Sequence, residues 1–224
     1  MALQTRFLMS LGIAGVLATA GLAAAAPVAV ASVPPAKARR TLEQKLEVLA
    51  ACGIKLARPF TTADLLKVAS RREYEETGWD VLLHALGAPE DVKPRRILCK
   101  NLRDLDVESI ERDGAYRAIA KSMAAITQGS LVLNGVKDHV DVAKSVAWLS
   151  FTLRGRRIRM NCEVDGTLLD HNVLLKFVGL LEAADPSKIY VIYDVGGEEV
   201  LVGCVKKTDL KKLNEHGIKF KPLR

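Results

Sequence analysis

Hydrophobic residues recur at helical spacing through the first part of the chain. Leu42 and Leu49 fall on one face of a helix, and Thr41 with Gln44 three positions later forms the sequence pattern of a capping box at its start. Similar signals predict further helices over 63–69, 71–76, 78–87 and 113–129, with a short strand over 95–102. We therefore expect residues 41–129 to form a mainly helical part.

The spacing of the hydrophobic residues changes from helical to alternating after residue 130. Ile158 and Met160 point to one side of a strand while Arg157 and Arg159 point to the other, as in a strand with one face in water. The segments of this part are strand 146–155, strand 156–164, helix 172–184, a hairpin over 188–207, helix 208–217 and a closing strand 218–223.

The order of these segments predicts an α+β fold. A helical N-terminal half, 41–129, would pack with an antiparallel sheet of ββαββα order in 130–224. About 185 residues are enough for one domain with a substantial core, so we expect 41–224 to be a single domain.

The first residues have the layout of a secretory signal peptide. Arg6 precedes an apolar run rich in alanine and glycine, and Ala29 and Ala31 place small side chains ahead of a cleavage point after Ala31. We expect residues 1–31 to be removed and 32–40 to form a flexible linker. The alternative is an uncleaved membrane anchor, because about 20 apolar residues can span a bilayer. No later segment is long and apolar enough to do so.

The chain is moderately basic, with 33 Lys and Arg against 26 Asp and Glu and a net charge of +7. Removal of residues 1–31 lowers this charge to +6, because Arg6 is the only charged residue in that segment. Such an excess suits an acidic partner or a membrane surface without requiring nucleic acid. Aromatic residues make up only 5% of the chain and none alternates with the arginines, which argues against a nucleic-acid partner.

Four cysteines, Cys52, Cys99, Cys162 and Cys204, lie far apart and show no zinc-binding spacing. Cys162 and Cys204 each point to the apolar face of a predicted strand, so a disulfide between them could form in an oxidising compartment. The alternative is that all four are small buried hydrophobic residues.

The phrase "EVDGTLLD" resembles the nucleophile loop of haloacid-dehalogenase-like phosphatases, in which one Asp attacks phosphorus and a second acts as acid and base. The resemblance would give these roles to Glu163 and Asp165. Glutamate is one methylene too long for that geometry, and only 54 residues follow Asp170, too few for the rest of the family's parallel sheet. We expect these residues to turn the chain, with Thr167 or Asp170 capping the next helix.

Asp138, His139 and Asp141 form the densest group of ionisable residues. Two carboxylates beside an imidazole could bind a divalent metal or raise the basicity of the His. The spacing is not specific for either role, and the alternative is a solvated loop whose aspartates cap local turns. We therefore assign no catalytic residue, metal ligand or cofactor, and name these three residues with Arg157 and Arg159 as candidate binding residues.

The segments "LEQKLEVLAACGIKL", "YEETGWDVLLHALG" and "DHVDVAKSVAWLSFTLRGRR" are similar to a group of uncharacterised bacterial proteins with the same order of segments, an α-helical N-terminal part followed by a ββαββα part. The similarity spans most of residues 41–224. It implies a fold but no activity, so no catalytic residue is carried over from it.

These patterns favour an exported binding domain over an enzyme. Core positions are well specified, whereas reactive groups are not seen to converge. We expect an immunity-type or inhibitor-type protein of the bacterial cell envelope, periplasmic or extracellular, that binds another protein. The alternatives are a hydrolase or metal-dependent enzyme built on the Asp/His group, and a structural protein of the envelope.

Overall fold

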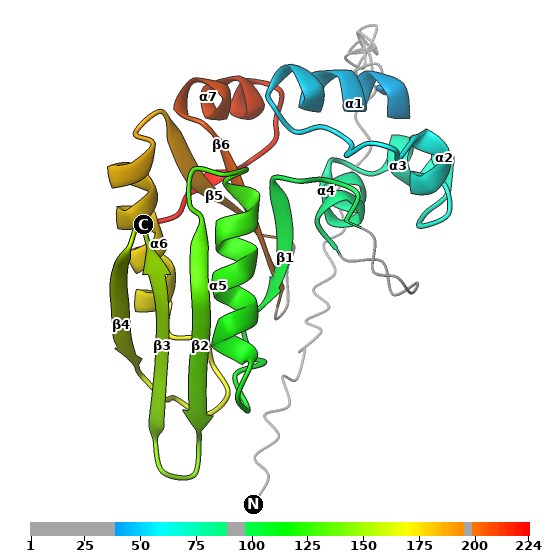
Figure 1. Cartoon of the computed structure of the whole chain (residues 1–224). Coiled ribbons are helices and arrows are strands. Elements are labelled where there is room, and N and C mark those ends of the chain that lie inside the picture. Colours follow the sequence, from blue (N-terminus) through cyan, green and yellow to red (C-terminus); the bar gives the residue numbers. More distant parts are fainter. Residues whose placement is uncertain (1–38, 89–96, 195–198) are drawn as a thin grey trace, which may run out of the picture. The chain divides into compact units, whose positions relative to one another are not determined.

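Figure 1 shows the computed structural model of the chain, which describes residues 39–88, 97–194 and 199–224. The segment expected to be a signal peptide, 1–31, and most of the expected linker lie outside these residues. The helices are α1 Leu42–Ala51, α2 Thr62–Leu65, α3 Arg71–Glu76, α4 Asp80–Gly87, α5 Ala115–Ile126, α6 His171–Ala184 and α7 Lys207–Glu215. The strands are β1 Leu102–Asp106, β2 Leu133–Asp141, β3 Val146–Leu153, β4 Arg156–Cys162, β5 Lys188–Asp194, β6 Glu199–Lys206 and β7 Lys221–Pro222.

The fold is therefore of mixed α and β type, with two antiparallel sheets. One sheet has four strands in the order β1-β6-β5-β7, and the other has three in the order β2-β3-β4. No helix within the described residues is both long and apolar enough to cross a membrane.

Local capping signals in the sequence correspond to helix starts. Thr41 and Gln44 form both hydrogen bonds of a capping box at α1, and Ser70 and Glu73 do the same at α3. Lys45 of α1 is only 5% exposed. Its ammonium group donates hydrogen bonds to the carbonyl oxygens of Thr77 and Gly78, which directly follow α3. These contacts fasten α1 to the end of α3.

The four-stranded sheet is covered on both faces. Leu201 and Val202 are neighbours in β6, and both are fully buried at 0% exposure, but they belong to different core clusters. Leu201 packs in the cluster that includes α1, α3, α4 and α7, whereas Val202 packs in the cluster that includes α5 and α6. Gly87 ends α4 so close to β6 that an added Cβ would lie 2.1 Å from Leu201 Cδ1.

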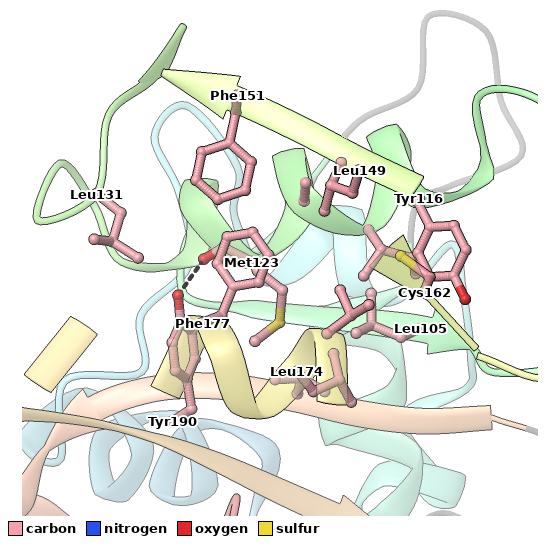
Figure 2. Close-up of a cluster of buried hydrophobic side chains, with 14 of the residues drawn as sticks. Leu105, Tyr116, Met123, Leu131, Leu149, Phe151, Cys162, Leu174, Phe177 and Tyr190 are labelled. Atoms are coloured by element: carbon pink, nitrogen blue, oxygen red, sulfur yellow. Dashed lines mark hydrogen bonds between the residues drawn. The ribbon is translucent and has the colours of Figure 1, made fainter. Parts of the chain in front are cut away.

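The three-stranded sheet buries one face and leaves the other accessible. In its central strand β3, Leu149 and Phe151 point inward and are buried, whereas Trp148 and Thr152 point outward and are only half-buried. Phe151 stacks on Phe177 of α6 with ring centroids 5.7 Å apart, at the centre of the core (Figure 2). The buried side of this sheet thus shares its core with α5, α6 and the four-stranded sheet.

Helix α5 is bonded to one sheet at each end. At its start, Asp138 Oδ2 of β2 accepts hydrogen bonds from the backbone N–H groups of Gly114 (2.8 Å) and Arg117 (3.0 Å). In its last turns, the carbonyl of Met123 accepts a 2.8 Å bond from the hydroxyl of Tyr190 in β5 (Figure 2). The helix is therefore fixed to both sheets by polar contacts as well as by its buried face.

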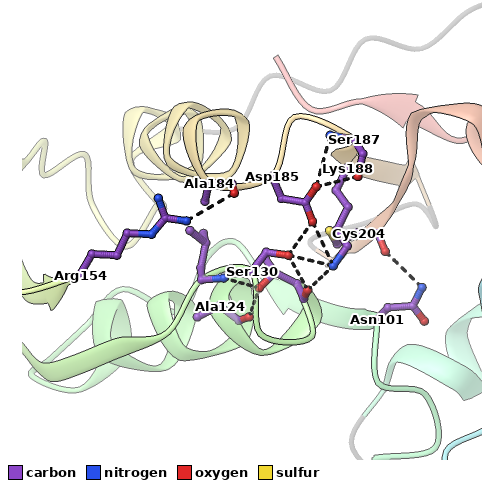
Figure 3. A network of polar contacts seen from close by, with 11 residues as sticks. Asn101, Ala124, Ser130, Arg154, Ala184, Asp185, Ser187, Lys188 and Cys204 are labelled. Carbon is purple, nitrogen blue, oxygen red and sulfur yellow. Dashed lines mark hydrogen bonds and ion pairs between the residues drawn. The ribbon is translucent and has the colours of Figure 1, made fainter.

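A polar network beyond the end of α5 reinforces its link to β5 (Figure 3). Lys188 Nζ donates to the carbonyl of Thr127 (2.9 Å) and to Ser130 Oγ (2.8 Å), and Ser130 Oγ donates to Asp185 Oδ2 (2.9 Å). Hydrogen bonds from Ser187 and Ser130 hold the pKa of Asp185 down at about 2. The same ammonium lies 3.5 Å from Asp185 Oδ2, so Lys188 joins two hydrogen bonds and an ion pair at this point.

Strand β2 was not expected from the sequence, and the prediction of a loop around Asp138 is wrong. Strand prediction relies on alternating apolar residues. In β2 that alternation is broken because an inward position carries Asp138, and because a bulge interrupts the pairing with β3 between Asn134 and Lys137. Residues 130–224 therefore begin with three consecutive strands where two were expected.

Strand β1 also departs from the expected division of the chain. It lies within 41–129, starts where the expected strand 95–102 ends, and pairs with β6 from residue 102 to residue 106. The helical part thus contributes an edge strand to the sheet of the second part, and the single expected sheet is two sheets.

Candidate functional site

The Asp/His group lies on β2, where consecutive side chains point to opposite faces of the sheet. Asp138 points inward and caps α5 through two backbone N–H groups. Asp141 ends the strand and receives a 2.8 Å hydrogen bond from Lys144 Nζ, which lowers the pKa of its carboxyl. The two carboxylates therefore do separate structural work on different sides of the strand.

His139 points outward, away from Asp138 and to the same side of β2 as Asp141. Its Nδ1 lies 3.1 Å from Asp113 Oδ1, and the same carboxylate oxygen accepts the backbone N–H of Val140 at 2.7 Å. Its ring centroid lies 6.2 Å from that of Trp148 on β3. Within the described part of the chain, no group of three or more His, Cys, Asp or Glu side chains could hold a metal ion.

Arg157 and Arg159 share the outer face of β4, as the alternation in the sequence predicted. Both are exposed, while Ile158 and Met160 between and beyond them turn inward. Arg159 places its guanidinium carbon 4.2 Å from the centre of the Trp148 ring, a cation–π contact.

No aromatic residue alternates with the arginines along their own strand, but the structure brings Trp148 of the neighbouring strand β3 against Arg159. Trp148 pairs with His139 on one side and with Asn161 on the other, so the register of three strands brings its ring between an imidazole and a guanidinium. Within its own strand Trp148 shares the polar side with Thr152, which was a visible sign that the ring points outward. The contact between Trp148 and Arg159 depends on strand pairing, so it cannot be predicted from the sequence of one segment alone.

The outward positions of the three strands make up the surface that we call the outer face. Paired positions across the three strands lie on the same side of a sheet, so the register assigns its members. They are Asn134, Lys137, His139, Asp141, Val146, Trp148, Ser150, Thr152, Arg157, Arg159 and Asn161, of which Ser150 is buried. Among the described residues, the cations Lys137, Arg157 and Arg159 have no carboxylate partner. By contrast, α3 carries ion pairs such as Arg72 with Glu76.

A groove lies beside β4 on its inner side. We call it the β4 groove; its volume is about 360 Å3. It is bounded by the β3–β4 hairpin and by one side of α6. Its lining residues are Leu153, Arg154, Arg156, Arg157, Ile158, Lys176, Leu180, Ala183 and Ala184. The lining thus combines an apolar floor with four cationic side chains, and no carboxylate takes part in it.

A second hollow, of about 640 Å3, lies between α1, the end of α3 with the connection to α4, and the end of α7. Three cationic and three anionic side chains line it, so it has no charge preference of its own. The ammonium of Lys45 is already bonded to the carbonyls of Thr77 (2.8 Å) and Gly78 (2.6 Å), and burial lowers its pKa. We treat this hollow as part of the packing between helices.

The phosphatase-like phrase turns the chain between β4 and α6. Glu163 directly follows an antiparallel strand, and Gly166 has a positive φ of 56° in the turn that Asp165 begins. Asp170 is the N-cap of α6 and accepts the backbone N–H groups of Asn172 and Glu163, each at 2.8 Å. The predicted capping role is confirmed for Asp170.

All four cysteines are free and buried, so the suggested bridge between Cys162 and Cys204 is not formed in this structure. The two residues lie on strands of different sheets, β4 and β6. Burial raises the pKa of each thiol to about 12, which suppresses the reactive thiolate. They behave here as small core residues.

Comparison with family models, with curated proteins and with solved structures gives no match for this chain. The geometry of the outer face and the β4 groove is therefore the basis of the functional argument.

Proposed function

We propose that this protein is an exported, non-catalytic domain that binds an acidic surface of another protein through the outer face. Its role would be that of an immunity-type or inhibitor-type protein of the bacterial cell envelope, in the periplasm or outside the cell. The observation that supports the proposal is a set of clustered cations, Lys137, Arg157 and Arg159, without carboxylate partners in the described structure.

Unpaired charge of one sign favours a partner of the opposite sign. Cations at an interface speed the encounter with an acidic surface and exclude basic surfaces. Trp148 adds an amphipathic ring in the middle of the same face, held in place by Arg159. Trp and Arg are the residue types most enriched among those that dominate protein–protein affinity. The outer face therefore combines charge selection with a central anchor.

The alternative of a hydrolase or metal-dependent enzyme receives no support from the positions of its candidate residues. Asp138 points inward to α5, while His139 and Asp141 on the outer side bond to different partners, Asp113 and Lys144. Glu163 and Asp165 lie in the connection to α6, and neither they nor the β2 residues line the two hollows described above. A shared reaction centre would require these groups to meet.

The sequence is the sole basis for the export part of the proposal. Residues 1–31 carry the pattern of a signal peptide, and they lie outside the described residues. Cell fractionation with mass spectrometry of the N-terminus tests it. A chain that starts at Ser32 in the envelope or medium supports export, and an unprocessed chain in the membrane fraction supports the anchor alternative.

The binding part can be tested by charge reversal. Envelope extract is passed over the immobilised protein and over the Arg157→Glu/Arg159→Glu variant, and captured proteins are quantified and then purified for affinity measurement. We expect the variant to lose about tenfold or more in affinity for an acidic partner, and salt to weaken the wild-type complex.

A matched control is the Lys211→Glu/Lys219→Glu variant. It changes the net charge by the same amount at exposed positions on and after α7, away from β4. Equal losses in both variants would show that binding follows net charge alone. Undiminished binding by the Arg157→Glu/Arg159→Glu variant would exclude the outer face as the contact surface.

A further inference from the structure

Strand β4 leaves one edge unpaired. Within the described residues it is hydrogen-bonded as a strand only to β3, over Arg156–Cys162. No backbone hydrogen bond among the described residues occupies its other side. An open strand edge presents a row of N–H and C=O groups that can pair with a further strand. Seven residues are a sufficient length for such pairing, because strands are usually 3–10 residues long.

The opposite edge of the same sheet is occupied. Helix α5 packs along β2, and Asp113 accepts the backbone N–H of Val140 near the end of that edge. A bulge between Asn134 and Lys137 further interrupts the strand. Bulges and covering elements block the addition of another strand. The sheet therefore has one edge that is closed and one that is open.

The residues around β4 differ between its outer and inner sides, and this difference determines which side chains an added strand should carry on each side. Successive side chains of a strand point to opposite faces, and a neighbouring strand lies about 4.8 Å away. On the outer side, such a strand would place its side chains beside Arg157 and Arg159. On the inner side, it would place them beside Ile158, in the β4 groove against Leu180 of α6.

The chemistry of those two sides selects the partner. Acidic residues suit the outer positions, because Arg157 has no carboxylate partner among the described residues and Arg159 has only the Trp148 ring. Apolar residues suit the inner positions, where the groove floor is formed by leucine, isoleucine and alanine. The rim cations of the groove, such as Lys176, also favour an acidic segment.

A second copy of this chain is a poor occupant. Pairing β4 with β4 of another copy would bring arginines of both chains onto one face, and like charges directly opposite each other are destabilising. Charged side chains on an open edge commonly prevent such self-association. The same arginines would attract an edge partner of opposite charge.

From these observations we infer that β4 receives an extended segment of a partner protein as a fourth strand, with acidic residues alternating with apolar ones. This inference rests on the proposed function and adds to it the mode of binding and the pattern of the bound segment. Main-chain hydrogen bonds would supply affinity, while the arginines and the groove would select the sequence.

Synthetic seven-residue peptides test the inference directly with the purified protein. The probe alternates glutamate with valine. One comparison peptide carries lysine in place of glutamate, and another carries N-methyl groups on alternate backbone nitrogens facing β4. We expect binding of the first, at least tenfold weaker binding of the lysine peptide, and loss of binding on N-methylation, because only strand pairing needs those N–H groups.

Hydrogen exchange of the backbone amides in 156–162 provides the second measurement. Peptide binding should slow exchange in this segment while leaving β2 unchanged. An Ala183→Trp variant, which fills the groove from an exposed position of α6, should lower the affinity for the peptide by about tenfold or more. An Ala118→Trp variant at an exposed position of α5 is the matched control and should bind normally.

The outcomes separate the inference from the proposed function. If the acidic peptide binds with salt dependence but N-methylation and the Ala183→Trp substitution have no effect, strand addition is wrong and binding to the outer face stands. If charge reversal at Arg157 and Arg159 leaves capture of an acidic partner unchanged, the proposed function itself is wrong. If no peptide slows exchange in 156–162 at millimolar concentration, the inference is overturned.

Discussion

The four-stranded sheet is buried on both faces, whereas the three-stranded sheet is buried on one. In the first, neighbouring residues Leu201 and Val202 enter two separate cores. In the second, Phe151 enters the core and its neighbour Thr152 faces the accessible side. A sheet enclosed by helices has no free surface to offer a partner. The three-stranded sheet has both a free face and a free edge within the described residues, and the proposed binding depends on these two surfaces.

The largest expected effect comes from the inward side of the three-stranded sheet. Phe151→Ala should lower the free energy of unfolding by about 3–5 kcal/mol, because it removes a buried ring stacked on Phe177. Thr152→Ala, one position along, should stay within about 0.5 kcal/mol of the wild type. Chemical denaturation of both variants measures the contrast. Similar losses at the two positions would mean that the outer face is covered after all.

A smaller effect is expected where α4 meets the four-stranded sheet. Gly87→Ala should cost about 1–3 kcal/mol, because the new methyl group would overlap Leu201 Cδ1. Gly179→Ala in α6 is the control, since no atom lies within 4 Å of its added Cβ. Alanine there should stabilise the protein by about 0.4–1 kcal/mol. Thermal or urea unfolding of the pair tests this, and a stable Gly87→Ala variant would contradict the close packing of α4 on β6.

The contact between the three-stranded sheet and α5 should contribute less again. Asp138→Ala removes the carboxylate that caps α5 and should cost about 0.5–2 kcal/mol of stability. Asp141→Ala, at the end of β2, removes only contacts with the exposed Lys144 and should leave the denaturation midpoint nearly unchanged. Addition of a chelator should change neither variant nor the wild type. A chelator-sensitive midpoint that disappears in both variants would instead favour the metal-dependent alternative.

The smallest effect concerns pH and the contact between α5 and the four-stranded sheet. The pKa of Asp185 is lowered from its ordinary 3.8 to about 2 by hydrogen bonds from Ser187 and Ser130. A carboxyl with a lowered pKa in the folded state stabilises that state above its ordinary pKa. The contribution should therefore be present above pH 4 and decline as the pH falls from about 4 to 2.

The Asp185→Asn variant isolates this contribution. Its stability should lie below that of the wild type at pH 6, and the two should converge as the pH approaches 2. Asp165→Asn, in an exposed turn, is the control and should show no such convergence. Denaturation curves collected at several pH values provide the comparison. A difference that is constant with pH would mean that the carboxylate is not held in its charged form by this network.

Local patterns were sufficient for much of the fold and for part of the candidate site. The capping boxes at Thr41 and Ser70 and the alternation of Arg157 and Arg159 are encoded within a few residues, and each was correctly predicted. Contacts between segments were not predictable in this way. The Trp148 ring meets Arg159 only through strand register, which depends on long-range pairing.

Strand β2 shows why the rest of the fold and of the candidate site was not predicted from the sequence. Its inward Asp138 caps the start of α5 by bonding backbone N–H groups 21 and 24 residues earlier in the chain, and the polar side chain needed for this breaks the apolar alternation that marks a strand. In the sequence alone, a polar residue at an inward strand position indicates a loop, because its hydrogen-bond partner in the fold is not known. In the sequence Asp138 also appears to form a group with His139 and Asp141, although strand geometry points Asp138 to the opposite side of the sheet from both.

Helix α5 has a consequence for how the molecule comes apart. It is fastened to β2 by Asp138 at one end and to β5 by Tyr190 at the other. Neither sheet can unfold without exposing the helix that both contact. The two sheets should therefore unfold together in a single all-or-none transition. The amide protons of α5 should then be among the last to be replaced by deuterium in heavy water.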